Sequence, residues 1–189
     1  MLRSSGTRFF GVSGSTTTGN PWEYWSAERI AQVAQCPVTS VQLVWPLVHR
    51  DLAKKGVATK NNQAAAIGTI AIETASTFMP VREAFWLTEE WRKANLRYYP
   101  WYGRSLIQLT WESNYDKCQK STGYPVHDNP ENAMEPEYAA GIFVWYWTVE
   151  RPTIPMEADR KNWPEVRRLV QGGSDGLPRL TAICTTLLA

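Results

Sequence analysis

The chain has 189 residues, of which 43% are hydrophobic and 20% charged, and its 20 Lys and Arg against 18 Asp and Glu give a formal net charge of +2. These values exclude an intrinsically disordered chain, a collagen-like chain and a polybasic arm that binds nucleic acid. At this length one domain can bury a core without metal or disulfide staples. We therefore expect no cofactor, no metal and no nucleic-acid partner.

The aromatic residues and the cysteines give further indications of the class of protein. Ten Trp against five Phe suit a protein that stacks flat rings on a ligand. Cys36, Cys118 and Cys184 are odd in number, widely spaced and without a C-x-x-C pair, which indicates buried free thiols and synthesis in a reducing compartment. Residues 1–20 contain no apolar run of signal-peptide length, and the longest apolar stretch, 139–147, is about half as long as a membrane span. The sequence predicts neither a signal peptide nor membrane insertion.

The pattern divides the chain into a flexible N-terminal segment, residues 1–25, and a single domain, residues 26–189. Gly, Ser and Thr dominate residues 1–20 without any hydrophobic period. Helical spacing starts at Ser26, which suits an N-cap, and continues through 39–52. No internal repeat and no linker separates a second domain.

The segment 63–73 is uniformly small and apolar, which predicts a helix buried on nearly every side and capped by Asn61 or Asn62. This helix ends in Glu73. Burial and the negative end of the helix dipole both raise the pKa of a carboxyl at such a place, and a raised pKa suits a general acid at neutral pH. The alternative is a Glu73 that points outward into water, as most charged side chains do.

Residues 79–101 mix charges with aromatic rings and predict a loop and a short helix over a groove. Residues 105–110 alternate in the manner of a strand that would present Gln108 and Thr110 to a cleft. Further helices are predicted over 112–119, 137–149, 163–171 and 178–188, with stops at Gly123 and at Gly172. The predicted fold class is mainly α, with a small β-hairpin or sheet flanking the cleft.

A second carboxylate, Glu83, follows in a turn that Pro80 would stiffen. Two carboxylates across a cleft are the minimum for glycoside hydrolysis, because one protonates the leaving oxygen and the other activates water. Two alternatives stay open: Glu89 or Glu90 as the base, and a structural pairing of Glu83 with Arg82 or Arg92.

The segment 99–115, Y-P-W-Y-G-R-S-L-I-Q-L-T-W-E-S-N-Y, resembles the Y-G-R-G-x-I-Q-L-T/S-x-x-x-N-Y signature of glycoside hydrolase family 19 chitinases and the related phage endolysins. Residues 64–83 are similar to the endolysin pattern of an Ala-rich helix ending in Glu-Thr, followed by Phe-x-Pro and a second Glu. Downstream, 129–131, 139–147 and 166–173 resemble the N-P-x, A-x-x-F-x-W and I-N-G-G segments. The resemblance covers residues 26–189 and implies a lysozyme-like α+β catalytic domain.

The resemblance also implies a role for each matching residue. Glu73 would be the general acid and Glu83 the general base, and Thr110 would hold the nucleophilic water beside the base. Arg104 matches the arginine of the signature and would either contact the substrate or clamp a carboxylate beneath the cleft. The residues implied to line the sugar subsites are Tyr102, Gln108, Asn114 and Gln171, the last standing where the family usually has Asn.

Several aromatic side chains have two interpretations, stacking on sugar faces or packing in the core. They are Trp101, Trp111, Tyr98 and Tyr99. By contrast, Trp145 and Trp147 lie in the apolar run 139–147 and are assigned to the core.

Departures from the family pattern occur at several positions, and those at Ile72, Ser105 and Gln171 support a second hypothesis, a noncatalytic glycan-binding module. Ile72 stands where the family often has His, Ala75 and Ser76 stand where it often has glycines, and Ser105 replaces the second Gly of Y-G-R-G. The Gln at position 171 belongs to the same set. The presence of both glutamates and of Thr110 argues against this hypothesis.

Two other hydrolytic chemistries rank lower. Zinc is disfavoured because His49 and His127 are the only histidines and form no H-E-x-x-H or Cys/His spacing. An amidase or peptidase that used Cys118 with His127 is disfavoured because Cys118 falls inside a predicted helix rather than at a helix start, where a thiolate is stabilised.

The sequence therefore predicts an inverting glycoside hydrolase, of lysozyme or muramidase type, that cleaves β-1,4 bonds between N-acetylated amino sugars. The compact length, the resemblance to the shorter endolysins and the missing signal peptide favour peptidoglycan strands as its partner and phage-induced lysis as its role. We expect a monomer held in the host cytoplasm until another protein opens the inner membrane and gives it access to the cell wall. A chitinase of the same family is the alternative.

Overall fold

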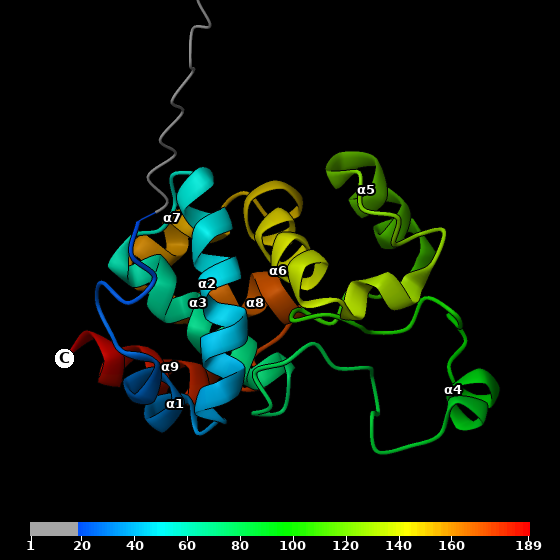
Figure 1. Cartoon of the computed structure of the whole chain (residues 1–189), viewed down its shortest axis with the longest axis horizontal. Coiled ribbons are helices and arrows are strands. Elements are labelled where there is room, and N and C mark those ends of the chain that lie inside the picture. Colours follow the sequence, from blue (N-terminus) through cyan, green and yellow to red (C-terminus); the bar gives the residue numbers. More distant parts are fainter. Residues whose placement is uncertain (1–18) are drawn as a thin grey trace, which may run out of the picture.

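The computed structural model describes residues 19–189, so most of the predicted N-terminal segment lies outside the described residues. Helices dominate this part of the chain, and Figure 1 shows their arrangement. The α-helices are α1 (Ala27–Ala34), α2 (Val38–Lys54), α3 (Lys60–Glu73), α4 (Glu89–Asn95), α5 (Glu112–Thr122), α6 (Pro136–Trp145), α7 (Ile154–Asp159), α8 (Trp163–Gln171) and α9 (Leu177–Leu188). A 3-10 helix, Pro130–Met134, precedes α6, and a π-helical turn, Tyr146–Glu150, follows it.

The predicted central helix is α3, which lies among α1, α7, α8 and α9. Its residues from Asn62 to Ala71 are all buried, as the small apolar pattern predicted. The close approach of α3 to α9 requires Gly68, because a Cβ there would stand 2.7 Å from Cδ1 of Leu180. The last helical residue is Glu73, so the fold places this carboxyl at the end of the core helix.

Helix caps follow the sequence signals with one correction. The Ser26 hydroxyl accepts a hydrogen bond from the Arg29 amide and caps α1, as predicted. The cap of α3 is Thr59 rather than Asn61 or Asn62, because the Thr59 hydroxyl accepts from the Asn62 amide. The Asn62 side chain is instead buried, where its oxygen accepts from the indole N–H of Trp147 at 3.0 Å. A buried amide with good partners is stable within the core, so this Asn serves packing rather than capping.

The predicted strand over 105–110 does not form. The described residues contain one isolated antiparallel bridge, between Arg104 and Leu109, and no strand. Ser105 and Gln108 adopt positive φ angles of 79° and 52°, which fold the segment into a tight turn and interrupt the extended geometry that a strand needs. The alternating pattern was read as a strand, but both Leu106 and Ile107 are buried under the turn.

Non-glycine residues occupy three positions at which the family pattern often has glycine. Ala75, Ser76 and Ser105 all have positive φ, at 48°, 67° and 79°. Left-handed backbone costs a residue with a Cβ about 1–2 kcal/mol. The chain therefore keeps a glycine-like backbone course at these turns despite the substitutions.

The segment that joins α3 to α5 extends away from the helices of the core, and α4 lies at its far side in Figure 1. The core itself includes Trp145 and Trp147, as predicted. Two elements, α7 and the 3-10 helix, were not predicted from the sequence pattern. Within residues 19–189 no helix combines the length and the apolarity needed to span a bilayer.

Candidate active site

Glu73 is buried rather than exposed to water. Its side chain is 12% exposed and forms an ion pair with Nη1 of Arg167, whose side chain is 3% exposed. Burial raises the pKa of Glu73 above its usual value, although Arg167 acts in the opposite direction. Burial therefore makes this carboxyl easier to protonate than an exposed glutamate, while the ion pair with Arg167 favours its charged form.

Arg167 comes from α8 and was missed by the sequence analysis. On this helix Trp163, Val166 and Arg167 are buried, whereas Arg168 pairs with Glu165 at the surface. The Nε of Arg167 also donates to the backbone carbonyl of Asp175, beyond the end of α8. An arginine at helical spacing from apolar residues was the available signal, because a charge on the buried face of a helix needs an opposite charge.

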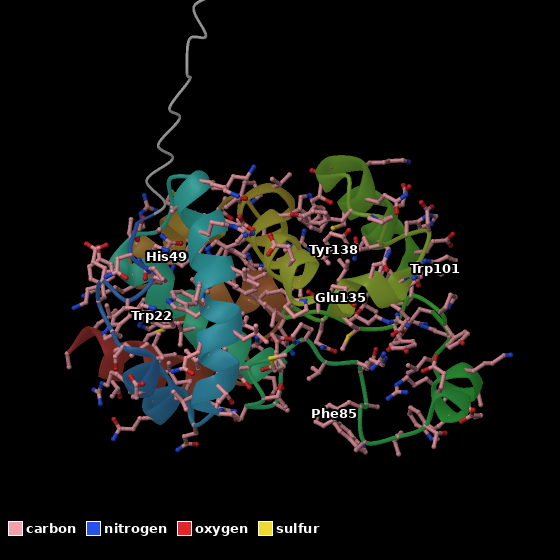
Figure 2. All side chains as sticks on the ribbon, in the orientation of Figure 1. Trp22, His49, Phe85, Trp101, Glu135 and Tyr138 are labelled. Carbon is pink, nitrogen blue, oxygen red and sulfur yellow. The ribbon has the colours of Figure 1, made fainter. Side chains whose placement is uncertain are left out.

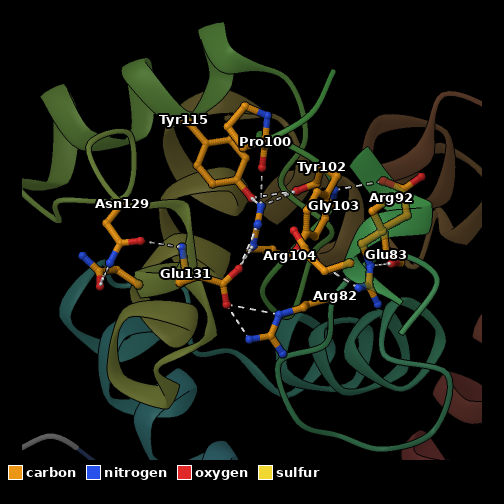
Figure 3. Close-up of polar contacts among 12 residues, drawn as sticks. Arg82, Glu83, Arg92, Pro100, Tyr102, Gly103, Arg104, Tyr115, Asn129 and Glu131 are labelled. Carbon is orange, nitrogen blue, oxygen red and sulfur yellow. Dashed lines mark hydrogen bonds and ion pairs between the residues drawn. The ribbon is translucent and has the colours of Figure 1, made fainter. Parts of the chain in front are cut away.

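Glu83 begins a turn three residues after Pro80, both of its carboxylate oxygens accept hydrogen bonds, and Figure 3 shows it beside Gly103. The hydroxyl of Tyr98 donates to Oε1 at 2.6 Å, and the amide of Gly103 donates to Oε2 at 2.9 Å. The backbone of Glu83 donates in turn to the Gly103 carbonyl. Arg92 donates to the Glu83 carbonyl, and neither Arg92 nor Arg82 pairs with the carboxylate. The structural pairing that the sequence left open is therefore wrong.

Gly103 lies between Glu83 and the turn at residues 105–108 of the signature segment, which we call the signature turn. A Cβ at this position would lie 2.6 Å from Oε1 of Gln108 and 3.3 Å from Oε2 of Glu83, so a larger residue would displace one of them. The Arg104–Leu109 bridge makes Thr110 the residue across from Gly103. Thr110 donates its hydroxyl proton to the Gln108 carbonyl at 2.7 Å. Gln108, Thr110 and Glu83 therefore gather around one glycine.

Arg104 acts as a clamp beneath this turn. It donates to Glu131 from Nε at 2.9 Å, and Arg82 pairs with the same carboxylate. Its guanidinium also stands 3.6 Å from the centre of the Tyr102 ring. Although burial acts to raise the pKa of Glu131, hydrogen bonds from the two arginines hold it below the usual value. Of the two roles considered for Arg104, its buried position favours the clamp.

Tyr102 takes a supporting position instead of facing solvent. It is fully buried, and its hydroxyl donates to Oε2 of Glu89 at 2.9 Å. A side chain with no exposed surface has no face to offer a sugar, so in this structure Tyr102 does not line an open sugar subsite. Its ring is instead in contact with two cations, the guanidinium of Arg104 at 3.6 Å and that of Arg92 at 5.5 Å from the ring centre.

The other predicted binding residues are spread over three elements. Asn114, in α5, donates to the Thr110 carbonyl at 2.8 Å and so fixes the end of the signature turn. Trp101 is half-buried, with its ring stacked on His127 at 5.7 Å and 10°. Gln171 is exposed at the end of α8 and accepts from the Gly173 amide at 2.9 Å.

Trp111 packs against Tyr98 and has a strained backbone conformation. Its φ of 77° and ψ of 137° belong to a region that is almost restricted to glycine, and such strain concentrates at functional sites. Its exposed ring lies 4.8 Å from the Tyr98 ring, with the Arg97 guanidinium at 5.0 Å. The ring therefore supports the tyrosine whose hydroxyl holds Glu83.

The alternative bases, Glu89 and Glu90, and the alternative nucleophile, Cys118, are in less suitable environments than Glu83. Glu89 is engaged by Arg92 and Tyr102, and Glu90 lies exposed in the first turn of α4. Burial raises the pKa of the Cys118 thiol to about 12, so this residue carries no thiolate at neutral pH. Both base rivals and the thiol are therefore poorer candidates than Glu83.

Comparison with known proteins places this arrangement on a recognised scaffold. No protein-family model matches the chain. The structure is similar to that of chitinase C from Streptomyces griseus HUT6037, with a TM-score of 0.61 and 21% identity over 86% of this chain and 76% of that chain. A glutamate-to-glutamine variant of chitinase C gives a TM-score of 0.60 and 18% identity over 86% and 91% of the two chains. The chain thus has the fold of these chitinases.

A sequence match agrees with the structural one over a shorter range. Fifty-six residues, 29% of this chain, are 36% identical to an endochitinase from Arabidopsis thaliana, and the match spans 20% of that protein's length. The mainly helical, lysozyme-like fold class predicted from the sequence is confirmed, while its β-hairpin is represented only by the isolated bridge.

Proposed function

We propose that the chain is a glycoside hydrolase that cleaves β-1,4 bonds between N-acetylated amino sugars by an inverting acid–base mechanism. The observation that carries this proposal is the contrast between two carboxyl groups. Glu73 is buried with a raised pKa, and Glu83 has hydrogen-bond donors on both oxygens beside the signature turn. When two carboxyl groups lie in different environments, the one that is easier to protonate is assigned as the acid and the other as the base.

In this mechanism Glu73 protonates the glycosidic oxygen and becomes a carboxylate. Arg167 already contacts it, so the new negative charge forms beside a fixed cation. Glu83 accepts a proton from a water that Thr110 helps to hold, and that water attacks the anomeric carbon from the opposite face. The configuration inverts, and such a mechanism requires the two carboxyl groups about 6.5–9.5 Å apart to leave room for the water.

We assign peptidoglycan as the substrate and phage-induced lysis of the host as the role. The signature resembles that of the shorter endolysins, and the chain would act on glycan strands from the host cytoplasm after another protein opens the membrane. Chitin is the second candidate, because the structural neighbours and the sequence relative are chitinases by name. The two polymers share their β-1,4-linked N-acetylated backbone, so the catalytic pair suits both.

Product analysis tests the reaction, and substrate preference tests the role. The purified protein should release reducing ends from peptidoglycan sacculi, with the new anomer inverted when followed by NMR at early times, and should leave crystalline chitin largely intact. Retention of configuration would overturn the mechanism. The reverse substrate preference would establish the chitinase alternative, and sedimentation with walls without new reducing ends would identify a binding module.

Tyr98→Phe tests whether the donor on Oε1 positions Glu83. Burial and the adjacent Glu83 raise the pKa of Tyr98 to about 12, so the hydroxyl remains a donor at neutral pH. Its removal should lower kcat by roughly tenfold, the value of one hydrogen bond to a charged group, and change KM little. Tyr24→Phe is the matched control, since Tyr24 packs on Trp25 outside the site and should behave as wild type. Equal changes in kcat and KM would contradict a positioning role.

A further inference from the structure

A cavity of about 550 Å³ lies next to the proposed base. It is lined by Arg82, Phe85, Leu87, Glu89, Arg92 and Glu131, and we call it the Arg82 pocket. Arg82 directly precedes Glu83, and Arg92 forms part of the wall while its guanidinium donates to the carbonyls of Glu83 and Ala84. Figure 3 shows Arg82 and Arg92 on either side of the Glu83 backbone. The pocket thus shares its wall with the segment that carries the base.

The pocket presents charges of both signs. Arg82 pairs with Glu131, and Nη1 of Arg92 lies 3.1 Å from Oε2 of Glu89. Arg92 is buried and fixed by the backbone carbonyls, whereas the other three charged side chains are 42–47% exposed. Exposed ion pairs are weak, about 0–1 kcal/mol, so they can exchange partners with a charged ligand.

An apolar wall completes the pocket. Phe85, labelled in Figure 2, lies on the loop before α4 and is 46% exposed, and Leu87 stands two residues further on. The neighbouring Trp86 is 71% exposed and packs its ring edge against Phe85 at 5.2 Å. Four of the five exposed aromatic side chains within residues 19–189 fall between positions 85 and 111. Clustered exposed rings mark a surface that a ligand covers.

A plain chain of N-acetylated amino sugars has no ionised group, so it can hydrogen-bond to these charged side chains but cannot form an ion pair with them. Peptidoglycan differs from chitin by a lactyl-linked peptide branch, which carries carboxylates, an amino group and methyl groups. We propose that the Arg82 pocket binds this peptide branch while the sugar backbone lies at Glu83, an inference that rests on the proposed function. Arg82 would receive a carboxylate, Glu131 the amino group, and Phe85 and Leu87 the alanine methyl groups, while the buried Arg92 keeps its contacts with the backbone.

The geometry allows the branch to reach the pocket. Arg82 in the pocket wall directly precedes Glu83, and Arg92 in the same wall donates to the Glu83 carbonyl at 2.8 Å, so the pocket adjoins the Glu83 backbone. A peptide of four residues spans up to about 14 Å, which is long enough to reach from a sugar held at Glu83 into an adjoining pocket. The branch would therefore distinguish peptidoglycan from chitin one residue away from the base.

The test compares two substrates made from one preparation of sacculi. One retains the peptide branches, and the other is stripped of them by an N-acetylmuramoyl amidase, which releases the peptides and leaves soluble glycan strands whose lactyl groups end in carboxylates; chitin oligomers serve as the reference without any carboxylate. Arg82→Gln and Leu87→Ala should each lower kcat/KM on the peptide-bearing strand by roughly tenfold, and affect the stripped strand far less. Leu43→Ala, the same truncation at an exposed position of α2, should leave the ratio between the substrates unchanged.

The outcomes separate the two proposals. Parallel losses on both substrates, or no loss on either, with an active wild-type protein would overturn the pocket assignment and leave the hydrolase intact. A wild-type protein that cleaves neither substrate would instead remove the proposed function. Thermal midpoints equal to wild type for both pocket variants, whose side chains lie at the surface, would exclude unfolding as the cause of a selective loss.

Discussion

Replacing Glu73 with Gln should reduce glycan hydrolysis by on the order of 10²-fold or more while the chain stays folded. Gln cannot donate the proton that the leaving oxygen needs, yet it retains an oxygen that can accept from Arg167. Easier burial of a neutral amide opposes the loss of the ion pair, so we expect a thermal midpoint within a few degrees of wild type. Release of reducing ends from peptidoglycan measures the loss of activity, and thermal unfolding measures the stability of the variant.

Glu165→Gln provides the matched control for this change. Glu165 pairs with Arg168 on the same helix that supplies Arg167, but at the surface. This variant should retain full activity because the pair lies outside the site. If Glu73→Gln unfolds the chain, or if it stays as active as wild type, Glu73 is a structural residue and the assignment of the acid is wrong.

Arg167→Leu should cause the largest loss of stability, about 3 kcal/mol at neutral pH. The substitution leaves the Glu73 carboxylate buried without its cation, and also removes the contact with the Asp175 carbonyl. For a chain of this length the midpoint should fall by roughly 10 °C. Arg168→Leu, which breaks an exposed pair one residue away, should change stability by about 1 kcal/mol or less.

The effect of Arg167→Leu should depend on pH in a defined direction. The folded state raises the pKa of Glu73, so between the unfolded and folded values the native chain binds more protons and stability falls as pH rises. Without Arg167 that pKa rises further, because the opposing charge is gone. The deficit relative to wild type should be small below about pH 4, where Glu73 is protonated in both states, and should grow toward neutral pH. Urea unfolding across this range measures it, and a deficit that shrinks with rising pH would contradict the ion pair as its source.

Local patterns in the sequence were sufficient for most helices. The spacing over 163–171 and its glycine stop match α8 residue for residue, with Gly172 in the left-handed conformation that ends it. The small apolar run before Glu73 identified α3 and its burial. These features succeed because helix propensity, periodicity and capping act within a few residues of one another.

Local patterns failed where distant contacts decided the structure. The alternation over 105–110 suggested a strand, but no neighbouring strand pairs with it, and turns at Ser105 and Gln108 take its place. Tyr102 was expected to face sugar, whereas its hydroxyl is bound to Glu89 in the interior. Whether a side chain faces solvent depends on what packs over it, and a short motif does not contain that information.

From the sequence alone came the helical class, the position of Glu73 at the end of a buried helix, and the choice of Glu83, Gln108 and Thr110 as candidate site residues. Only the tertiary structure paired Glu73 with Arg167, 94 residues further along the chain, and set the Tyr98 hydroxyl on Glu83. The physical reason is the distance along the chain over which each interaction acts. Periodicity and turn preferences involve residues a few positions apart, whereas a buried charge pairs with whichever opposite charge the fold places next to it. That proximity exists only after α3 and α8 have packed together.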